Sequence, residues 1–141
     1  MLGGMTHPQA TGRILKRAQY RNHRAMDVSL AAVGTTLVQW DALRVISEMP
    51  DSSAHELAVA TFQSDQAFGT LANRLQKQGL IERSSGRGRR VEHRLTSAGS
   101  VVLAAGQDVA KRVSARSFAA LSPAEMATLH ELLLRVGEVV E

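Results

Sequence analysis

One segment restricts the possible folds more than any other part of the chain, because short helical patterns alternate in it with strong helix-ending signals. Ser53 and Glu56 have the spacing of a capping box, in which a hydroxyl and a carboxylate satisfy free backbone amides at a helix start. They predict a short helix over residues 54–60. After a three-residue turn, Ser64 can cap a second helix, whose apolar residues recur every three or four positions until Gly79. Two helices joined by so short a turn are typical of a helix-turn-helix.

A glycine-rich tip between two short extended runs follows these helices. The runs begin at Leu80 and Val91, and the tip between them contains Gly86 and Gly88. This pattern is typical of a β-hairpin. A hairpin placed after a helix-turn-helix makes a winged helix-turn-helix. The predicted fold class is therefore mainly α with a small β-hairpin wing.

Two helices are predicted before this unit. Apolar residues at spacings of three and four predict a first helix that starts at Gly12 and ends at Gly34, a residue type that commonly terminates helices. Thr35 or Thr36 can cap a second helix that reaches about Met49. We expect the residues before the first helix to form a flexible leader, because they contain two glycines and a proline.

Two further helices are predicted after the hairpin. Thr96 can cap a long helix that reaches about Ala120, and Ser122 with Glu125 forms a second capping box. The last helix has three consecutive leucines, which packing on one side cannot all hide. We therefore expect a homodimer in which the terminal helices of two chains interlock. The predicted organisation is a flexible leader at 1–11, a dimerisation helix at 12–34, a winged helix-turn-helix domain at 35–95 and C-terminal dimerisation helices at 96–141.

Positive charge is concentrated in the same part of the chain as the predicted hairpin. The whole chain has a formal net charge of +4, and residues 62–95 alone, with seven Lys and Arg against three Asp and Glu, also carry +4. Phosphate neutralisation needs such clustering, because counterion release scales with the number of contacts. A narrow arginine-bearing tip could also enter the minor groove of DNA. The clustering disfavours the alternative, a merely solvated charged loop, so we expect the domain at 35–95 to bind DNA.

The second helix of this motif would lie in the major groove of that DNA. Gln can pair with adenine, Thr can contact a thymine methyl, and Arg can bind guanine or phosphate. Gly69 costs about 1 kcal/mol relative to alanine inside a helix, and either close approach of the backbone to DNA or packing against another helix would explain it. The predicted contact residues are Ser64, Asp65, Gln66, Gly69, Thr70, Asn73, Arg74 and Lys77 on the helix and Arg87, Arg89 and Arg90 at the tip.

Several other classes of protein do not fit this sequence. The chain has no cysteine, which excludes disulfides, thiolate chemistry and cysteine-bound zinc. Its five histidines form no close pair with metal-binding spacing, and no nucleophile elbow, phosphate loop or carboxylate pair stands out. We therefore expect neither enzyme activity nor a cofactor or metal. No long apolar run and no signal peptide are present, so we expect a cytoplasmic protein.

Several stretches of the chain occur together in a combination that is specific for one family of proteins. They are Gln39–Arg44, Leu71–Arg83 and Arg89–Val91, the last followed by Leu95–Gly99. Together they resemble the MarR family of bacterial transcription regulators, and the resemblance covers roughly residues 12–140. It implies a triangular homodimer with winged-helix lobes. It also implies binding to a pseudopalindromic operator, usually repression, and release from DNA by small anionic or phenolic ligands.

The sequence departs from the family pattern at two positions. The family often has an aspartate two residues before the wing arginine that enters the groove, whereas here Gly88 precedes Arg90. We therefore expect this wing to be less well oriented. The family also often has an arginine in the recognition helix where this chain has Thr70, so the operator sequence of relatives cannot be transferred.

By the same resemblance, a ligand pocket would lie between the dimerisation helices and the DNA-binding lobe. An indole beside a guanidinium would suit a small aromatic or anionic effector such as an aromatic carboxylate. Trp40 and Arg44 share a helix face. The favoured alternative is a core tryptophan, with Arg44 paired to Asp41 or Glu48. The predicted pocket residues are Asn22, His23, Met26, Trp40 and Arg44.

Other functional interpretations remain open at this stage. The winged helix could be a protein-interaction module, although such modules usually lose the basic wing. The protein could also bind DNA without any ligand. A basic stripe on the first helix could attract an anionic ligand or distal phosphates, but a solvated face is the favoured explanation. The stripe consists of Arg13, Lys16, Arg17, Tyr20, Arg21 and Arg24.

Overall fold

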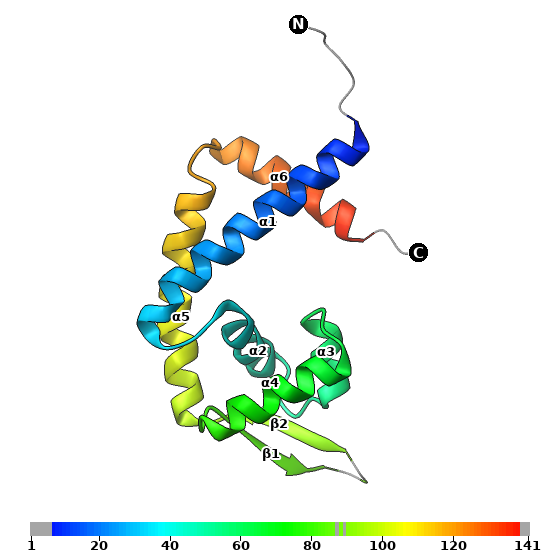
Figure 1. The fold of residues 1–141 in the computed structure, drawn as a ribbon, viewed down its shortest axis with the longest axis vertical. Coiled ribbons are helices and arrows are strands. Elements are labelled where there is room, and N and C mark those ends of the chain that lie inside the picture. The colour runs from blue at the N-terminus through cyan, green and yellow to red at the C-terminus, as the bar shows by residue number, and fades with distance from the viewer. Residues whose placement is uncertain (1–6, 87, 89, 139–141) are drawn as a thin grey trace, which may run out of the picture.

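The computed structural model describes residues 7–86, 88 and 90–138 and shows a mainly helical chain with one β-hairpin (Figure 1). The helix-turn-helix and the hairpin form a lobe at the lower end of this view, α1 and α6 occupy the upper part, and α5 runs from the lobe up to α6. The elements are α1 (Pro8–Leu30), the 3-10 turn η1 (Ala31–Val33), α2 (Leu37–Glu48), α3 (Ala54–Ala60), α4 (Asp65–Lys77), β1 (Ile81–Ser85), β2 (Val91–Leu95), α5 (Ser97–Ser117) and α6 (Pro123–Gly137).

Side-chain caps set most helix starts, as the sequence predicts. Ser53 and Glu56 form the reciprocal capping box of α3, and Ser122 and Glu125 do the same for α6. Each box satisfies backbone amides that have no partner inside the helix. The remaining predicted helix-end residues are confirmed at Thr36, Ser64 and Thr96, and at Gly34, which is left-handed with φ of 79°.

The first helix begins earlier than the sequence predicts. α1 starts at Pro8 rather than Gly12, so the expectation of a flexible leader is wrong for residues 8–11. Proline suits the first position of a helix, because its missing N–H would have no partner there and its φ is already helical. The ring of His7 accepts a hydrogen bond from the amide of Gln9 at 3.2 Å, which caps the helix.

The wing is a two-stranded antiparallel sheet anchored in the lobe. Its register places Ile81 opposite Leu95. A single bridge between Ser52 and His93 attaches the α2–α3 connection to β2. The wing is therefore fixed at its base along two edges of β2, by β1 and by this connection.

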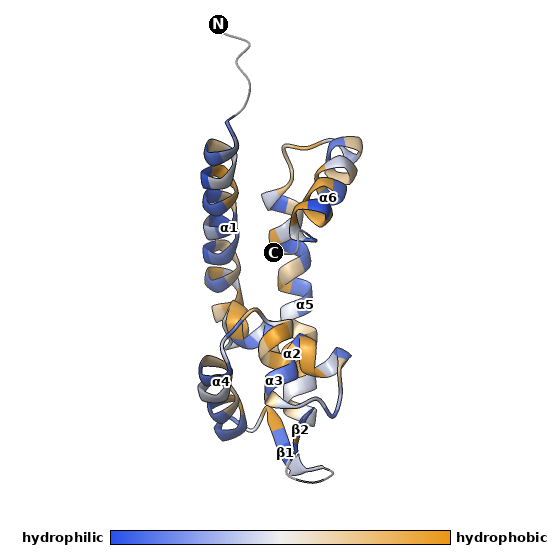
Figure 2. Cartoon of the chain, turned by 90° about the vertical axis from the view of Figure 1, so that its right-hand side faces the viewer, coloured by the Kyte–Doolittle hydropathy of each residue, from blue (hydrophilic) through white to orange (hydrophobic). Residues whose placement is uncertain are grey.

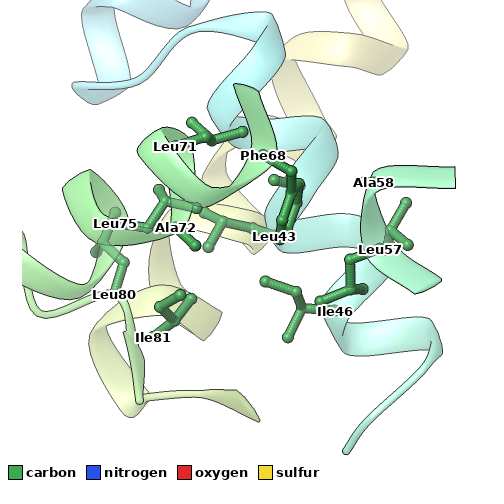
Figure 3. Close-up of a cluster of buried hydrophobic side chains, with 12 residues drawn as sticks. Leu43, Ile46, Leu57, Ala58, Phe68, Leu71, Ala72, Leu75, Leu80 and Ile81 are labelled. Atoms are coloured by element: carbon green, nitrogen blue, oxygen red, sulfur yellow. The ribbon is translucent and has the colours of Figure 1, made fainter. Parts of the chain in front are cut away.

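Two apolar clusters hold the protomer together. The first fills the lobe, where Phe68 of α4 packs with Leu43 of α2 and Leu57 of α3 (Figure 3). The second joins α1, α2 and α5 around Trp40 and Met26. The lobe thus has a core of its own, and the second cluster connects it to the long helices.

The far end of the protomer has no comparable packing. α1 and α6 overlap in Figure 1, but Figure 2 shows them apart, with apolar residues along α6. No residue of α6 is buried among those described, and leucines 132–134 are all exposed. Ile14 and Leu15 of α1 are exposed too. Apolar surface of this extent marks an interaction site. No helix in the described part of the chain is long and apolar enough to cross a membrane.

Candidate nucleic-acid interface

Helix α4 presents a polar face to solvent while its opposite face holds the lobe core. The buried side carries Phe68, Leu71, Ala72 and Leu75. Because the two sides are segregated, the polar face can contact another surface without disturbing the core. The residues predicted to bind DNA lie on that polar face: Ser64, Asp65, Gln66, Thr70, Asn73, Arg74 and Lys77 are exposed, and Gly69 is half-buried.

The first turn of α4 keeps hydrogen-bonding groups available. The hydroxyl of Ser64 accepts from the amide of Ala67 at 3.1 Å, so its own O–H remains able to donate. Asp65 lies 2.9 Å from Nδ1 of His55 on α3. This contact links the N-terminal end of α4 to α3 through the Asp65 carboxylate.

Gly69 lies in the middle of α4 without a packing reason. A Cβ atom at this position would meet no heavy atom within 4 Å beyond the helix itself and the adjoining residues. Packing against another helix was one of two explanations for this glycine, and within the described protomer that explanation is wrong. The other explanation, close approach of the backbone to DNA, stays a prediction.

Arg83 connects the wing to the recognition helix. It lies on β1 and donates from Nη2 to the amide oxygen of Asn73 at 2.6 Å and from Nε to that of Gln76 at 2.8 Å. These bonds cross from the hairpin to α4. They orient the Asn73 amide, whose NH2 group is left to donate. The recognition helix and the wing consequently form one polar surface rather than two independent elements.

Two ion pairs fasten the wing to the α2–α3 connection and to α3. Arg94 of β2 binds Asp51 through Nε and Nη2, the latter at 2.8 Å. Arg90 binds the Glu56 carboxylate and also donates to the carbonyl of Asp51 at 3.2 Å. The hydrogen bond from Arg94 lowers the pKa of Asp51. Hydrogen bonds from Ser53, aided by the charge of Arg90, lower the pKa of Glu56, so both carboxylates are ionised near neutral pH.

These contacts correct one expectation about the tip of the wing. The glycine at position 88, with φ of 66°, was expected to leave Arg90 poorly oriented. Instead Glu56, which also caps α3, supplies the carboxylate that holds Arg90 in place. Arg90 is exposed, so its remaining N–H groups can still reach outward. Arg87 and Arg89 lie outside the described residues.

Behind the wing, His93 is fully buried between β2 and α4. Its ring meets Phe68 edge-on with 6.1 Å between centroids. Nδ1 lies 2.9 Å from the carbonyl oxygen of Ser52 and therefore carries the proton, while Nε2 has no partner among the described residues. Burial lowers the pKa of His93, and although the bond to Ser52 opposes this, the charge of Arg83 adds to it. The ring is thus a neutral packing element of the lobe.

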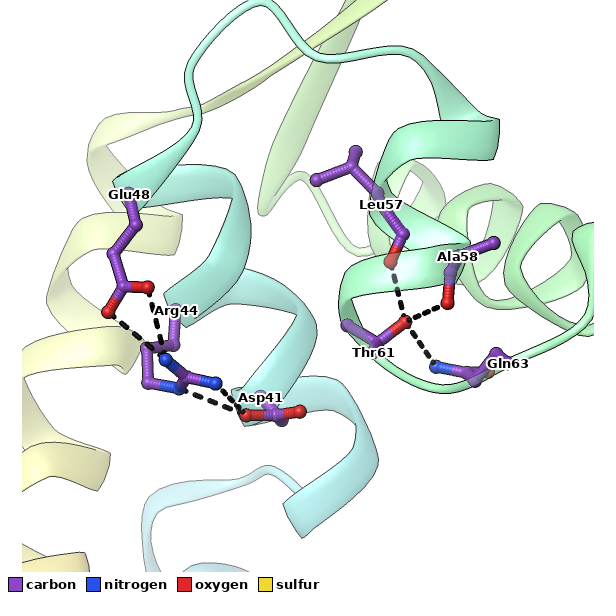
Figure 4. Close-up of polar contacts among 7 residues, drawn as sticks. All are labelled: Asp41, Arg44, Glu48, Leu57, Ala58, Thr61 and Gln63. Atoms are coloured by element: carbon purple, nitrogen blue, oxygen red, sulfur yellow. Dashed lines mark hydrogen bonds and ion pairs between the residues drawn. The ribbon is translucent and has the colours of Figure 1, made fainter. Parts of the chain in front are cut away.

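Four of the five residues predicted to form a ligand pocket are used for packing or pairing in the protomer. Trp40 is buried, and its Nε1 donates to the carbonyl of Leu103 at 3.1 Å. Arg44 pairs with Asp41 at 2.7 Å and with Glu48 at 3.1 Å (Figure 4), which is the arrangement that the alternative interpretation describes. Met26 is also in the core, whereas Asn22 and His23 are half-buried, and His23 lies 3.3 Å from Asp27.

A different hollow lies between α1 and α5. Its volume is about 330 Å³, and apolar side chains line it together with two arginines. Neither arginine forms an ion pair with a described residue. No group of three His, Asp or Glu side chains in the described part of the chain could hold a metal ion. The residues that line the hollow are Arg24, Ala25, Val28, Ser29, Val113, Arg116 and Ser117.

This combination of helices, wing and polar face is shared with known regulators. Residues 33–90 match the model of the MarR family. The structure of a probable transcriptional regulator from Pseudomonas aeruginosa has a TM-score of 0.82 and 32% identity to this chain. The match covers 89% of this chain and 95% of that one. The chain belongs to the MarR family.

A second relative in the MarR family has been solved with bound molecules. The HTH-type transcriptional repressor Rv2887 of Mycobacterium tuberculosis is 26% identical over 136 residues, which cover 95% of this chain and 98% of that protein. Its complexes with p-aminosalicylic acid and with DNA have TM-scores of 0.75 and 0.74 at 25% and 24% identity. They cover 90% of this chain and 98% and 97% of the respective structures. The protein is thus a MarR-type transcription regulator.

Several residues that organise the MarR-type lobe were missed from the sequence. Arg83 was counted only as charge and Glu56 only as a cap. Asp51, which binds Arg94 and has φ of 66°, was not singled out. Their partners lie up to 43 residues away in the sequence, so no local pattern reveals the pairing. The excess of arginines in the wing could have pointed to these partners, because such arginines often pair with nearby carboxylates.

Proposed function

We propose that the protein is a homodimeric repressor that binds a pseudopalindromic operator, with α4 in the major groove and the wing in the adjacent minor groove. The observation that carries this proposal is the fixed relation between the two elements. Arg83 joins β1 to α4, and Glu56 holds Arg90 beside α3. A polar helix and a cationic hairpin held together in this way fit two neighbouring grooves of one duplex. We place this activity in the cytoplasm, with the DNA.

The exposed face of α4 has the chemistry for reading bases. Gln66 can bind adenine with two hydrogen bonds, and Thr70 can contact a thymine methyl. Arg74 and Lys77, in the last turn, suit phosphates, and Arg90 suits the minor groove. The other proposed contacts are Ser64, Asp65, Gly69, Asn73, Arg87 and Arg89.

Dimerisation would pair two such lobes. The exposed leucines of α6 and the apolar residues of α1 need a partner, and a second copy of the chain offers the same surface in a symmetric arrangement. Two recognition helices roughly 34 Å apart could then enter successive major grooves on one side of B-DNA.

A small aromatic carboxylate is the proposed effector, with its site in the hollow between α1 and α5. Arg24 and Arg116 can bind a carboxylate, while Val28 and Val113 can contact an aromatic ring. The complex of Rv2887 with p-aminosalicylic acid supports this class of ligand. The hollow lies between α1 and α5, which join the lobe to the proposed dimer end of the protomer. Filling it would change the angle between the lobes and hence the spacing of the recognition helices.

The decisive experiment measures binding to the DNA upstream of the protein's own gene. A fluorescence anisotropy titration over a salt series should give a specific complex, whose log affinity falls linearly with log salt. A shuffled duplex of the same composition is the control. Equal affinity for both duplexes would overturn the repressor proposal.

The effector is tested on that same complex. Adding p-aminosalicylate should release the DNA, whereas 3-aminophenol, which lacks the carboxylate, should not. The variant Arg116→Ala should bind DNA normally but need more p-aminosalicylate for release. Equal release by both compounds, or unchanged sensitivity of the variant, would contradict the assignment of the site.

A further inference from the structure

Phe62 is an aromatic residue that the fold holds in solvent. Its side chain is 96% exposed, although Trp40 and Phe68 are buried. It occupies the turn between α3 and α4 with φ of 58°, a left-handed conformation. A bulky residue in this region of backbone space is uncommon, because its Cβ approaches the following carbonyl oxygen. Glycine would adopt the same conformation without strain.

The surrounding hydrogen bonds impose this conformation. The amide of Phe62 donates to the carbonyl of Val59 at 3.2 Å, and the amide of Gln63 donates to that of Ala58 at 2.9 Å. The Thr61 hydroxyl donates to the carbonyl of Leu57 at 2.7 Å (Figure 4). The turn is therefore held on both sides of position 62. The aromatic side chain contributes nothing to this arrangement, so the fold does not explain its presence.

The place of Phe62 in the chain suggests its use. Phe62 stands two residues before Ser64, which caps α4. Its backbone therefore leads directly into the first turn of the helix, where the proposed base contacts begin. When that turn enters the major groove, an exposed side chain two residues before it is within reach of the duplex.

We propose that Phe62 makes an apolar contact with the operator, on a thymine methyl or on the face of a deoxyribose. This inference rests on the proposed function, since it requires α4 to bind DNA. Phenylalanine can contact thymine methyl groups in the major groove, and such contacts discriminate between bases. The strain at position 62 is then maintained for binding, as backbone strain often is at functional sites.

The test is the variant Phe62→Gly, measured for both stability and DNA binding. Glycine relieves the strained backbone, so the melting temperature should rise by a few degrees. The dissociation constant for the operator should nevertheless increase about tenfold. The slope of log affinity against log salt should stay the same, because an apolar contact releases no counterions. Phe62→Asn, which also tolerates the left-handed conformation, should weaken binding similarly.

Val101→Ala provides the matched control, because Val101 is exposed on α5 and not on α3, on α4 or in the turn between them. It should leave the affinity for the operator unchanged. An operator with uracil in place of thymine separates the two contacts: if the wild type loses affinity and Phe62→Gly does not, the ring contacts a methyl group, and otherwise it contacts a sugar. Unchanged affinity of Phe62→Gly, a lower melting temperature or a shallower salt slope would overturn the inference. Failure of the wild type to prefer its operator would instead overturn the proposed function.

Discussion

The winged helix-turn-helix lobe buries its apolar side chains, whereas helix α6 leaves them exposed. In the lobe, Leu43, Leu57 and Phe68 come from three helices and are completely buried against one another. In α6, Leu132 and its neighbours are exposed, and no described residue of the helix is buried. The lobe is thus complete within one chain, whereas the end formed by α6 requires a partner.

Polar contacts show the same difference. The lobe is crossed by bonds between elements, including Arg83 with Asn73, Arg90 with Glu56 and Arg94 with Asp51. The side-chain hydrogen bonds described for α6 stay within its own capping box and first turns. The surface proposed for DNA recognition and the surface proposed for dimerisation therefore lie on different parts of the chain, so single substitutions should affect one without the other.

The largest expected effect breaks the dimer. Leu132→Asp places a charge on the exposed face of α6, where it would be buried between two chains. The protein should become monomeric in light scattering, and its affinity for the full operator should fall at least about a hundredfold, because the two half-sites are no longer bound together. Val59→Asp, a matching change at an exposed position of α3 in the lobe, should leave the dimer intact. A dimeric Leu132→Asp protein would show that α6 is not part of the interface.

A smaller effect is expected at the wing, and it should leave the dimer unchanged. Arg90→Ala removes an exposed cation whose partner Glu56 lies on the surface, so the free energy of unfolding should change by less than about 0.5 kcal/mol. Operator affinity should fall about tenfold, and the salt slope should become shallower by about one for each wing. Lys111→Ala, on α5, is the control. An unaltered slope would mean that Arg90 makes no phosphate or groove contact.

The helix ends in both regions could be predicted from the sequence, because they depend on residues close together in the chain. Capping residues such as Ser53 and Ser122, and the terminating Gly34, predicted helix ends that the structure confirms. The first helix was placed too late because Pro8 was taken as a break, although proline is favoured in the first turn.

The connections inside the lobe could not be predicted in this way. Glu56 binds Arg90 across 34 residues and Asp51 binds Arg94 across 43, and sequence spacing contains no information about such pairs. For a similar reason, the sequence could not decide whether Trp40 lies in the core or in a ligand pocket. Its role in the core depends on Gly106 of α5, which lies so close to the indole that any side chain there would overlap it.

A moderate effect on stability is expected on the polar face of α4, where one variant separates the stability of the helix from its affinity for DNA. Gly69→Ala adds a methyl group that meets nothing in the protomer, so the helix should become more stable by about 1 kcal/mol. If the backbone approaches DNA at this point, affinity for the operator should fall at the same time. Thermal unfolding and anisotropy titration measure the two quantities. A stabilised variant with full affinity would show that Gly69 is not needed for close approach.

The smallest expected effect concerns pH and tests whether the wing packs as part of the lobe. Because the pKa of His93 is lowered in the folded protein, its stabilising effect is complete above the unfolded pKa of about 6.5 and is lost as the pH falls through the folded value. Protonation would place a charge against Phe68 and near Arg83. The melting temperature should therefore drop by a few degrees between about pH 7.5 and about pH 5.5.

His93→Leu should remove this decrease. Leucine preserves the apolar contact, and the carbonyl of Ser52 still accepts from the backbone amide of residue 93 at 3.2 Å. The exposed pair of His55 and Asp65 is present in both proteins and cancels in the comparison. If both proteins lost stability equally, the pH dependence would arise elsewhere, and the wing would not be coupled to α4 through this ring. A decrease confined to the wild type would instead show that protonation of His93 weakens the packing of the wing against α4.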